Sequence, residues 1–201
     1  MSVNEAIDFL MNWQDLDQSW LEAIHRATPA SWEPWMQAIT TLGSLEVLGA
    51  LVVLVVAVLA WLRQWQPAIT LAVSGLLTLL LRQALKELFH RPRPELWATL
   101  SESTYSFPSG HALGSVIIYG MLIYLLSQRR PRWRVFLWGL YGVLVIAIGF
   151  SRLYLGLHWP TDVLGGWAFG ALALFGLIFW HERHLGMLTH LWNKLHARFK
   201  P

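Results

Sequence analysis

Residues 108–127 read PSGHALGSVIIYGMLIYLLS, a stretch in which His111 is the only side chain that can gain or lose a charge near neutral pH. About twenty largely apolar residues are what a helix needs to cross the hydrocarbon core of a bilayer. A basic connection, QRRPRWR at 128–134, follows directly. The stretch predicts a membrane-spanning helix with polar groups, Pro-Ser-Gly-His, at one end.

The rest of the chain repeats this apolar pattern. Similar stretches occupy 42–62, 67–88, 135–151 and 163–180, and the 201 residues are 55% hydrophobic and only 13% charged. Soluble domains carry about 25% charged residues. Each stretch could be a buried core helix, but five of them leave too little polar chain to cover a soluble protein. We therefore expect an all-α integral membrane bundle of about five transmembrane helices.

The composition also excludes several classes of protein. A mean hydropathy of +0.44 rules out a disordered chain and a nucleic-acid-binding module, despite the net charge of +3. No cysteine is present, which excludes disulfides and thiolate metal sites. Histidines 181, 184, 190 and 196 near the carboxyl end are irregularly spaced, so we expect them to be solvated at the interface rather than to bind a metal.

The basic residues predict the direction of the spans. Nine of the fifteen lie on one face of a five-span arrangement, in the connections after the first and third spans and in the tail, together with a single acid, Glu182. Basic loops stay in the cytoplasm. The amino terminus should lie outside, followed by a membrane-embedded domain at 44–180 and a basic cytoplasmic tail at 181–201.

Residues 1–43 have a different character, with six acids and one base. Apolar residues recur there at steps of three and four, which is typical of an amphipathic helix: Val3, Ile7, Leu10, Trp13, Leu16, Trp20 and Ile24. We favour packing of this apolar face against the bundle. The alternative is a helix on the outer leaflet that serves as a lid or a dimer contact.

Polar residues gather at the outer ends of the predicted spans in three clusters. They read KELFHRPRP at 86–94, PSGH at 108–111 and SRLYLGLHWPTD at 151–162. Lys86, Arg93 and Arg152 suit phosphate oxygens, because arginine forks and lysine ammonium groups bind them well. Ser109 and Gly110 follow Pro108, which we expect to be the first helical residue, so their backbone N–H groups can face an anion.

Two histidines accompany these cations. On a helical turn Asp162 can reach one ring nitrogen of His158, which fixes the tautomer and leaves the other nitrogen free to attack. His111 can give and take a proton near neutral pH. Each cluster alone could be structural. Lys86 and Arg93 could be flanking cations and Pro108–Gly110 a helix cap, Arg152 could pair with Glu46 or an acid of the outer loop, and His158 and Asp162 could be a structural pair. Together on one face they indicate a phosphate site.

The combination Lys-x6-Arg-Pro, Pro-Ser-Gly-His and Ser-Arg-x5-His-x3-Asp resembles the signature of the type 2 phosphatidic acid phosphatase superfamily. The resemblance implies an acid phosphatase/vanadium haloperoxidase-like core. It implies that His158 forms a phosphohistidine, that Asp162 orients it, and that His111 protonates the leaving group and then activates water. The residues that it implies for binding the phosphate are Lys86, Arg93, Ser109, Gly110 and Arg152.

The resemblance is strongest to bacterial phosphatidylglycerophosphatase B-like and undecaprenyl-diphosphatase-like enzymes. The former have six spans, whereas the acidic segment 1–43 replaces the first span here. It implies hydrolysis, without a metal or other cofactor, of a phosphomonoester or diphosphate of a lipid such as phosphatidylglycerophosphate, phosphatidate or undecaprenyl diphosphate. The active site would face the periplasm or outside of a bacterial inner membrane, as in cell-wall building.

Other functions stay open at this level. A lipid phosphotransferase could use the same phosphohistidine, and an anion-binding membrane protein need not be an enzyme. A vanadium haloperoxidase is disfavoured by the spans, since those enzymes are soluble. The expected partners are the lipid substrate and the membrane, with no nucleic acid. The oligomeric state is open, because the small pair Gly166 and Gly170 could serve a dimer or the bundle itself.

Overall fold

The computed structural model describes residues 3–94, 96–97 and 105–198, and it describes side chains for 14–94, 96–97 and 105–183. These residues form helices and turns without a strand. The helices are α1 (Val3–Ala27), η1 (Ala30–Trp32), α2 (Glu33–Leu42), α3 (Leu45–Trp61), α4 (Trp65–Phe89), α5 (Gly110–Arg129), η2 (Pro131–Trp133), α6 (Arg134–Tyr154) and α7 (Pro160–Arg198).

The apolar helices form the predicted membrane bundle. Among the described residues, four helical segments are long and apolar enough to span a membrane: Trp65–Phe89, Gly110–Arg129, Pro131–Tyr154 and Pro160–Arg183. A fifth span is obtained if Ala30–Leu42 and Leu45–Trp61 count together, with a 44° bend between them. The bend lies where Ser44 caps α3 by accepting a hydrogen bond from Val47 N–H at 3.2 Å. The expectation of an all-α bundle of about five spans is confirmed.

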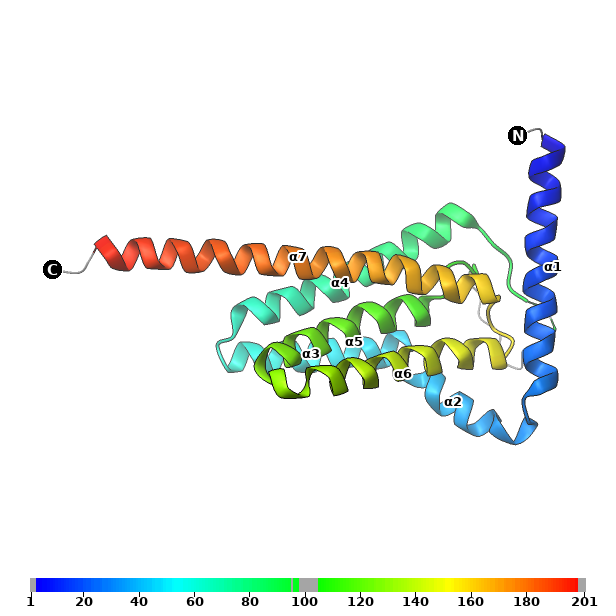
Figure 1. The fold of residues 1–201 in the computed structure, drawn as a ribbon, viewed down its shortest axis with the longest axis horizontal. Coiled ribbons are helices and arrows are strands. Elements are labelled where there is room, and N and C mark those ends of the chain that lie inside the picture. Colours follow the sequence, from blue (N-terminus) through cyan, green and yellow to red (C-terminus); the bar gives the residue numbers. More distant parts are fainter. Residues whose placement is uncertain (1–2, 95, 98–104, 199–201) are drawn as a thin grey trace.

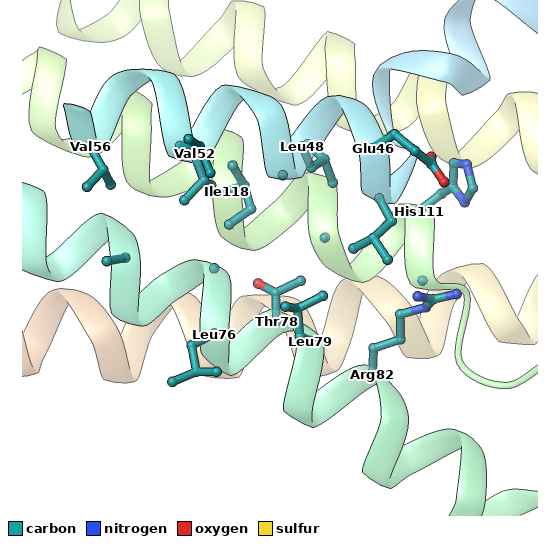
Figure 2. Close-up of a pocket in the computed structure, with 18 of the residues that line it drawn as sticks. Glu46, Leu48, Val52, Val56, Leu76, Thr78, Leu79, Arg82, His111 and Ile118 are labelled. Atoms are coloured by element: carbon teal, nitrogen blue, oxygen red, sulfur yellow. The ribbon is translucent and has the colours of Figure 1, made fainter. Parts of the chain in front are cut away.

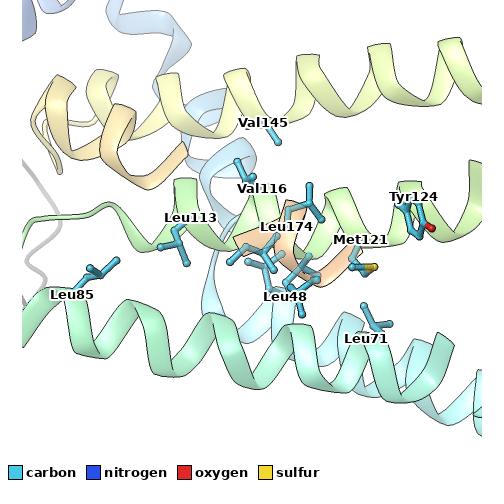
Figure 3. Close-up of a cluster of buried hydrophobic side chains, with 12 residues drawn as sticks. Leu48, Leu71, Leu85, Leu113, Val116, Met121, Tyr124, Val145 and Leu174 are labelled. Carbon is cyan, nitrogen blue, oxygen red and sulfur yellow. The ribbon is translucent and has the colours of Figure 1, made fainter. Parts of the chain in front are cut away.

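Helix α5 lies at the centre of the bundle, between the other spans (Figures 1 and 3). Its buried side chains form one core with residues of α3, α4, α6 and α7. Helix α7 approaches α5 closely, because a Cβ on Gly166 would meet Ser109 O at 2.8 Å and one on Gly170 would meet Val116 Cβ at 2.9 Å. This small pair therefore packs inside the bundle.

The outward surfaces of the spans are apolar, as contact with lipid requires. Val53, Val143, Leu172 and Phe175 are between 67% and 72% exposed. Exposed tryptophans mark the end of the bundle where α3 ends and α4 and α6 begin, as is typical of a membrane–water interface: Trp61, Trp65 and Trp133.

Helix α1 lies across the opposite end of the bundle, where α6 ends and α7 begins (Figure 1). It packs through Asp17 and Leu21, which are 1% and 0% exposed. Leu16 and Trp20, on the predicted apolar face, are 44% and 55% exposed. The favoured interpretation, in which this apolar face packs against the bundle, is wrong for Leu16 and Trp20. The side of α1 that faces the bundle carries the acidic Asp17 instead.

Two helix boundaries also differ from the sequence predictions. Helix α5 begins at Gly110 with Ser109 as its N-cap, so Pro108 precedes the cap and is not the first helical residue. Helix α7 continues unbroken to Arg198, through the predicted boundary between the membrane domain and the tail. The expectation that the histidines near the carboxyl end are solvated is wrong for His181, which is 6% exposed and whose Nδ1 lies 2.7 Å from Thr70 Oγ1. The side chains of His184, His190 and His196 lie outside the described set.

Candidate active site

The turn between α6 and α7 positions His158 and Asp162. Gly156 allows this turn through its positive φ of 67°. His158 Nδ1 lies 3.3 Å from Asp162 Oδ2, and the two side chains are 1% and 0% exposed. The same Asp162 oxygen accepts a hydrogen bond from Trp159 N–H at 2.9 Å, which caps the start of α7. The helix start therefore holds the carboxylate that orients the imidazole.

Asp162 has two further partners from the segment between α4 and α5. Arg91 Nη1 donates to Oδ1 at 2.7 Å, and the Ser106 hydroxyl donates to Oδ2. A buried carboxylate is stable as an anion when it is paired and hydrogen-bonded in this way. The hydrogen-bond network thus assigns a proton to His158 Nδ1 and leaves the lone pair on its Nε2.

Arg93 lies against the second ring nitrogen of His158, Nε2. Its Nη1 is 3.2 Å from His158 Nε2 and donates to Leu157 O at 2.6 Å. Its Nη2 lies 3.5 Å from Tyr105 O. The backbone therefore orients this guanidinium beside the nitrogen that the sequence predicts as the nucleophile.

His111 and Arg152 form a second histidine–arginine pair at the same end of the bundle. Arg152 is 2% exposed, and its Nη1 donates to Thr40 Oγ1 of α2 at 3.1 Å. The same nitrogen lies 3.5 Å from His111 Nε2, in the first turn of α5. Figure 2 shows the Glu46 carboxylate of α3 pointing toward the His111 ring. The site thus contains two imidazoles, each beside a guanidinium: His158 beside Arg93 and His111 beside Arg152.

The PSGH motif is joined to α7 through the main chain. Ser109 N–H donates to Asp162 O at 2.9 Å, and Ser109 Oγ accepts from Ala112 N–H at 3.4 Å. The Ser109 N–H is therefore engaged with the protein, whereas its hydroxyl hydrogen can still be donated. Lys86, in the last turn of α4, is 3% exposed. The structure thus places all eight predicted site residues at one end of the bundle.

Asp17 extends the Asp162 network onto α1. Arg91 Nη2 donates to Asp17 Oδ2 at 2.5 Å while its Nη1 contacts Asp162. Thr161 N–H donates to Asp17 Oδ1 at 2.9 Å, and the Thr161 hydroxyl also donates to this carboxylate. Arg91 is thereby held between two buried carboxylates, one of which orients His158.

An apolar groove runs from the site along the bundle between α3, α4 and α5 (Figure 2). Its volume is about 890 Å³. Small residues open it, and at Gly49 an added Cβ would meet nothing within 4 Å. Its polar end is lined by Glu46, Arg82, Gly110 and His111. The groove therefore connects one histidine of the site with an apolar passage on the side of the bundle.

Sequence reasoning missed several of these residues. Ser106, Thr40 and Asp17 lie outside the three motifs, and only tertiary packing brings them to the site. Thr161 lies within the 151–162 motif, but the sequence assigned it no role. The one sequence feature that could have drawn attention to Ser106 is its position just before Pro108, the first residue of the PSGH motif. Within the part of the chain that the structure describes, no group of three or more His, Asp or Glu side chains could hold a metal ion.

Comparison with known proteins places this site in a family. The model of the PAP2 superfamily matches residues 65–185. Phosphatidylglycerophosphatase B of Bacillus subtilis is 36% identical over 166 residues, which cover 79% of this chain and 81% of the relative. An undecaprenyl-diphosphatase of Sulfolobus acidocaldarius is 32% identical over 113 residues, covering 53% of this chain and 52% of the relative.

A solved structure is also similar over most of the chain. The crystal structure of the transmembrane PAP2-type phosphatidylglycerolphosphate phosphatase from Bacillus subtilis superposes with a TM-score of 0.78 at 32% identity, covering 85% of this chain and 86% of that one. Fold and site together define an integral membrane helical bundle with histidines and arginines gathered at one end. The chain belongs to the PAP2 superfamily.

Proposed function

We propose that this chain is a membrane lipid phosphatase that hydrolyses a phosphomonoester or diphosphate of a lipid through a phosphohistidine on His158. The observation that carries the proposal is the arrangement of His158, with Nδ1 on Asp162 and Nε2 beside Arg93. A neutral imidazole in this tautomer is a nucleophile that needs no further activation. The names of the relatives, phosphatidylglycerophosphatase B and undecaprenyl-diphosphatase, support the reaction class.

In the first step His158 Nε2 attacks phosphorus and the bond to the leaving oxygen breaks. Arg93 and Arg152, with Lys86, Ser109 and Gly110, bind the phosphoryl oxygens and stabilise their charge in the transition state. Asp162 stabilises the positive charge that forms on the His158 ring. His111 gives its proton to the leaving oxygen, since a poor leaving group needs general-acid assistance.

In the second step water attacks the phosphohistidine. His111 takes a proton from that water, because the acid of the first step is the base of the second. The products are inorganic phosphate and the restored His158. Three cationic side chains supply the charge stabilisation, so we propose that neither step needs a divalent metal.

The apolar groove supports a lipid as the substrate. It begins at His111, where the leaving group would be protonated, and continues between α3 and α4 along apolar side chains. A hydrocarbon chain in the groove would keep the phosphate at the level of the site without leaving the membrane. The relatives' names include both a phospholipid and an isoprenoid diphosphate, so these are the substrate classes to test.

We also propose that the site faces the outside of the cell membrane. The end that carries Arg129, Arg130 and Trp133 is the predicted cytoplasmic end, and the site lies at the opposite end. In this arrangement residues 1–43 lie outside, 44–180 form the membrane domain, and 181–201 form the cytoplasmic tail. An outer site would act on lipid carriers after their use on that side.

The test is phosphate release by the purified protein in detergent, with phosphatidylglycerophosphate, phosphatidate and an isoprenoid diphosphate as substrates. We expect release from at least one lipid, unchanged by EDTA, and ³²P bound covalently to a histidine in acid-sensitive form. His158→Ala should abolish both signals, whereas His25→Ala, an exposed histidine on α1 that stacks on Trp97, should preserve them.

Other outcomes would contradict parts of this proposal. Activity lost in EDTA and restored by Mg²⁺ would exclude the metal-independent mechanism. Transfer of the phosphate to a second lipid, with little free phosphate, would identify a phosphotransferase. Release of no phosphate from any substrate would favour an anion-binding protein without enzymatic activity.

A further inference from the structure

Arg82 lies at the polar end of the apolar groove, outside the three motifs. It is on α4, one helical turn before Lys86, so the two side chains lie on the same face of the helix. It lines the groove together with Glu46, Gly110 and His111. Figure 2 shows its side chain pointing along α4 toward the end of the groove where His111 and Glu46 lie.

The start of α5 leaves room for this side chain. A Cβ built on Gly110 would meet Arg82 Nε at 2.6 Å and Cδ at 2.9 Å. Any residue larger than glycine at this position would therefore push the guanidinium away. Gly110 thus serves the groove as well as the phosphate site, because it allows a cation to lie directly against the first turn that carries His111.

The position of Arg82 relative to the two histidines defines which part of a substrate it meets. In phosphoryl transfer the attacking and leaving groups lie roughly in line on opposite sides of phosphorus. His111 lines the groove, whereas His158 is not among the residues that line it. If His158 attacks and His111 protonates the leaving oxygen, the groove lies on the leaving-group side, and Arg82 lies there with it.

A cation on that side suits a leaving group that itself carries a phosphate. The leaving group of a phosphatidate is a neutral alcohol, whereas that of a lipid diphosphate is a lipid monophosphate with its own negative charge. An arginine fork matches phosphate oxygens and gains strength away from bulk water.

We propose that Arg82 binds the lipid-linked phosphate of a diphosphate substrate and makes the enzyme selective for lipid diphosphates over lipid monophosphates. The inference rests on the proposed function. His158 Nε2 forms a bond to the terminal phosphorus as the bond from that phosphorus to the bridging oxygen breaks. The bridging oxygen keeps the electron pair, takes the proton of His111 and leaves as the lipid monophosphate, held by Arg82 until water hydrolyses the phosphohistidine.

The experiment compares one isoprenoid chain carrying either a diphosphate or a monophosphate. In Arg82→Gln, kcat/KM for the diphosphate should fall by about 10- to 100-fold, the loss expected for one charge-assisted hydrogen bond. For the monophosphate it should change by less than about threefold. Arg82→Lys should recover part of the diphosphate activity, since it keeps the charge. The same change at the other end of the bundle, Arg63→Gln, should affect neither substrate.

Product inhibition provides a second measurement that does not depend on turnover of both substrates. The isoprenoid monophosphate should inhibit Arg82→Gln about tenfold less strongly than it inhibits the unchanged enzyme. Phosphatidylglycerophosphate is a third substrate, because its leaving group carries a phosphodiester farther from the broken bond. A selective loss with that lipid and not with the diphosphate would overturn the assignment to diphosphates and point to the phosphodiester.

The results separate this inference from the proposed function. Equal losses for the diphosphate and the monophosphate, with phosphate still released, would overturn the role of Arg82 and leave the phosphatase intact. If the unchanged protein releases no phosphate from either lipid, the proposed function fails and the inference fails with it. Thermal unfolding of each variant shows whether a uniform loss reflects a loss of folded protein.

Discussion

Single side chains in this site serve more than one partner, and Asp162 is the clearest example. Its two oxygens hold the His158 ring, the Ser106 hydroxyl, the Trp159 N–H and the Arg91 guanidinium. The spacing of four residues between the histidine and the aspartate was sufficient to predict their contact. Local spacing carries no information on Ser106 or Arg91, because the chain between α4 and α5 brings them to Asp162 only after the bundle has packed.

The ion pair between the buried Asp17 and the half-buried Arg91 predicts an effect on turnover from a residue outside the proposed substrate-binding set. Asp17→Asn keeps a hydrogen-bond acceptor for Thr161 N–H but removes the charge that holds Arg91. We expect kcat to fall about tenfold, equivalent to about 1.4 kcal/mol of lost positioning of Asp162, with KM unchanged. Steady-state kinetics below the unfolding temperature measures both constants.

The matched control is Asp15→Asn on the exposed side of the same helix. It removes the same charge from α1 without touching Arg91, so its kcat should equal that of the unchanged enzyme. A rise in KM for Asp17→Asn, or a lower unfolding temperature with kcat unchanged, would show that Asp17 does not act through Asp162.

Whole helices differ in how far the sequence predicts their surroundings. The apolar spans of α4, α5, α6 and α7 were predicted because lipid requires long apolar stretches. The packing face of α1 was not predicted. Its periodic apolar residues suggested that they would be buried, whereas Asp17 and Leu21 are the residues that pack against the bundle. Leu16 and Trp20 stay exposed, as expected of an amphipathic helix whose apolar side meets a headgroup layer.

The groove between α3 and α4 gives a prediction that separates lipid from water-soluble substrates. Gly49→Phe places a ring where the chain leaves open space, so it should fill the groove without displacing protein atoms. We expect kcat/KM for a long-chain lipid phosphate to fall at least about tenfold, and that for a small aryl phosphate to stay within about twofold.

Gly139→Phe on α6 is the control, because a Cβ there also meets nothing within 4 Å but the residue does not line the groove. It should leave both substrates unaffected. Equal losses with the lipid and the aryl phosphate in Gly49→Phe would mean that the groove does not hold the lipid chain.

The molecule as a whole has two chemically different ends. One carries arginines and exposed tryptophans, and the other carries the histidines, cations and carboxylates of the site. The sequence predicted this division because the positive charges of connections and of motifs fall on opposite faces of the bundle. It could not show that α1 closes one side of the site end, since that depends on long-range contacts of Asp17 with Arg91 and Thr161.

The direction of the bundle in the membrane can be measured on a cysteine-free background, since the chain contains no cysteine. Ala30→Cys and Arg130→Cys place single thiols at exposed positions on the two ends. In intact cells a membrane-impermeant maleimide should label Ala30→Cys and spare Arg130→Cys until the membrane is opened. The reverse pattern would place the site in the cytoplasm and exclude an outer substrate pool.

The hydrogen bond from Ser109 N–H to Asp162 O joins two motifs without any side chain. This bond is insensitive to most mutations, since every residue except proline supplies the same backbone N–H at 109 and every residue supplies the same carbonyl at 162. Activity lost in Ser109→Ala can therefore be attributed to the missing hydroxyl, and activity lost in Asp162→Asn to the altered carboxylate, rather than to this bond. In a mutational scan, Ser109→Pro should stand apart from every other variant at that position.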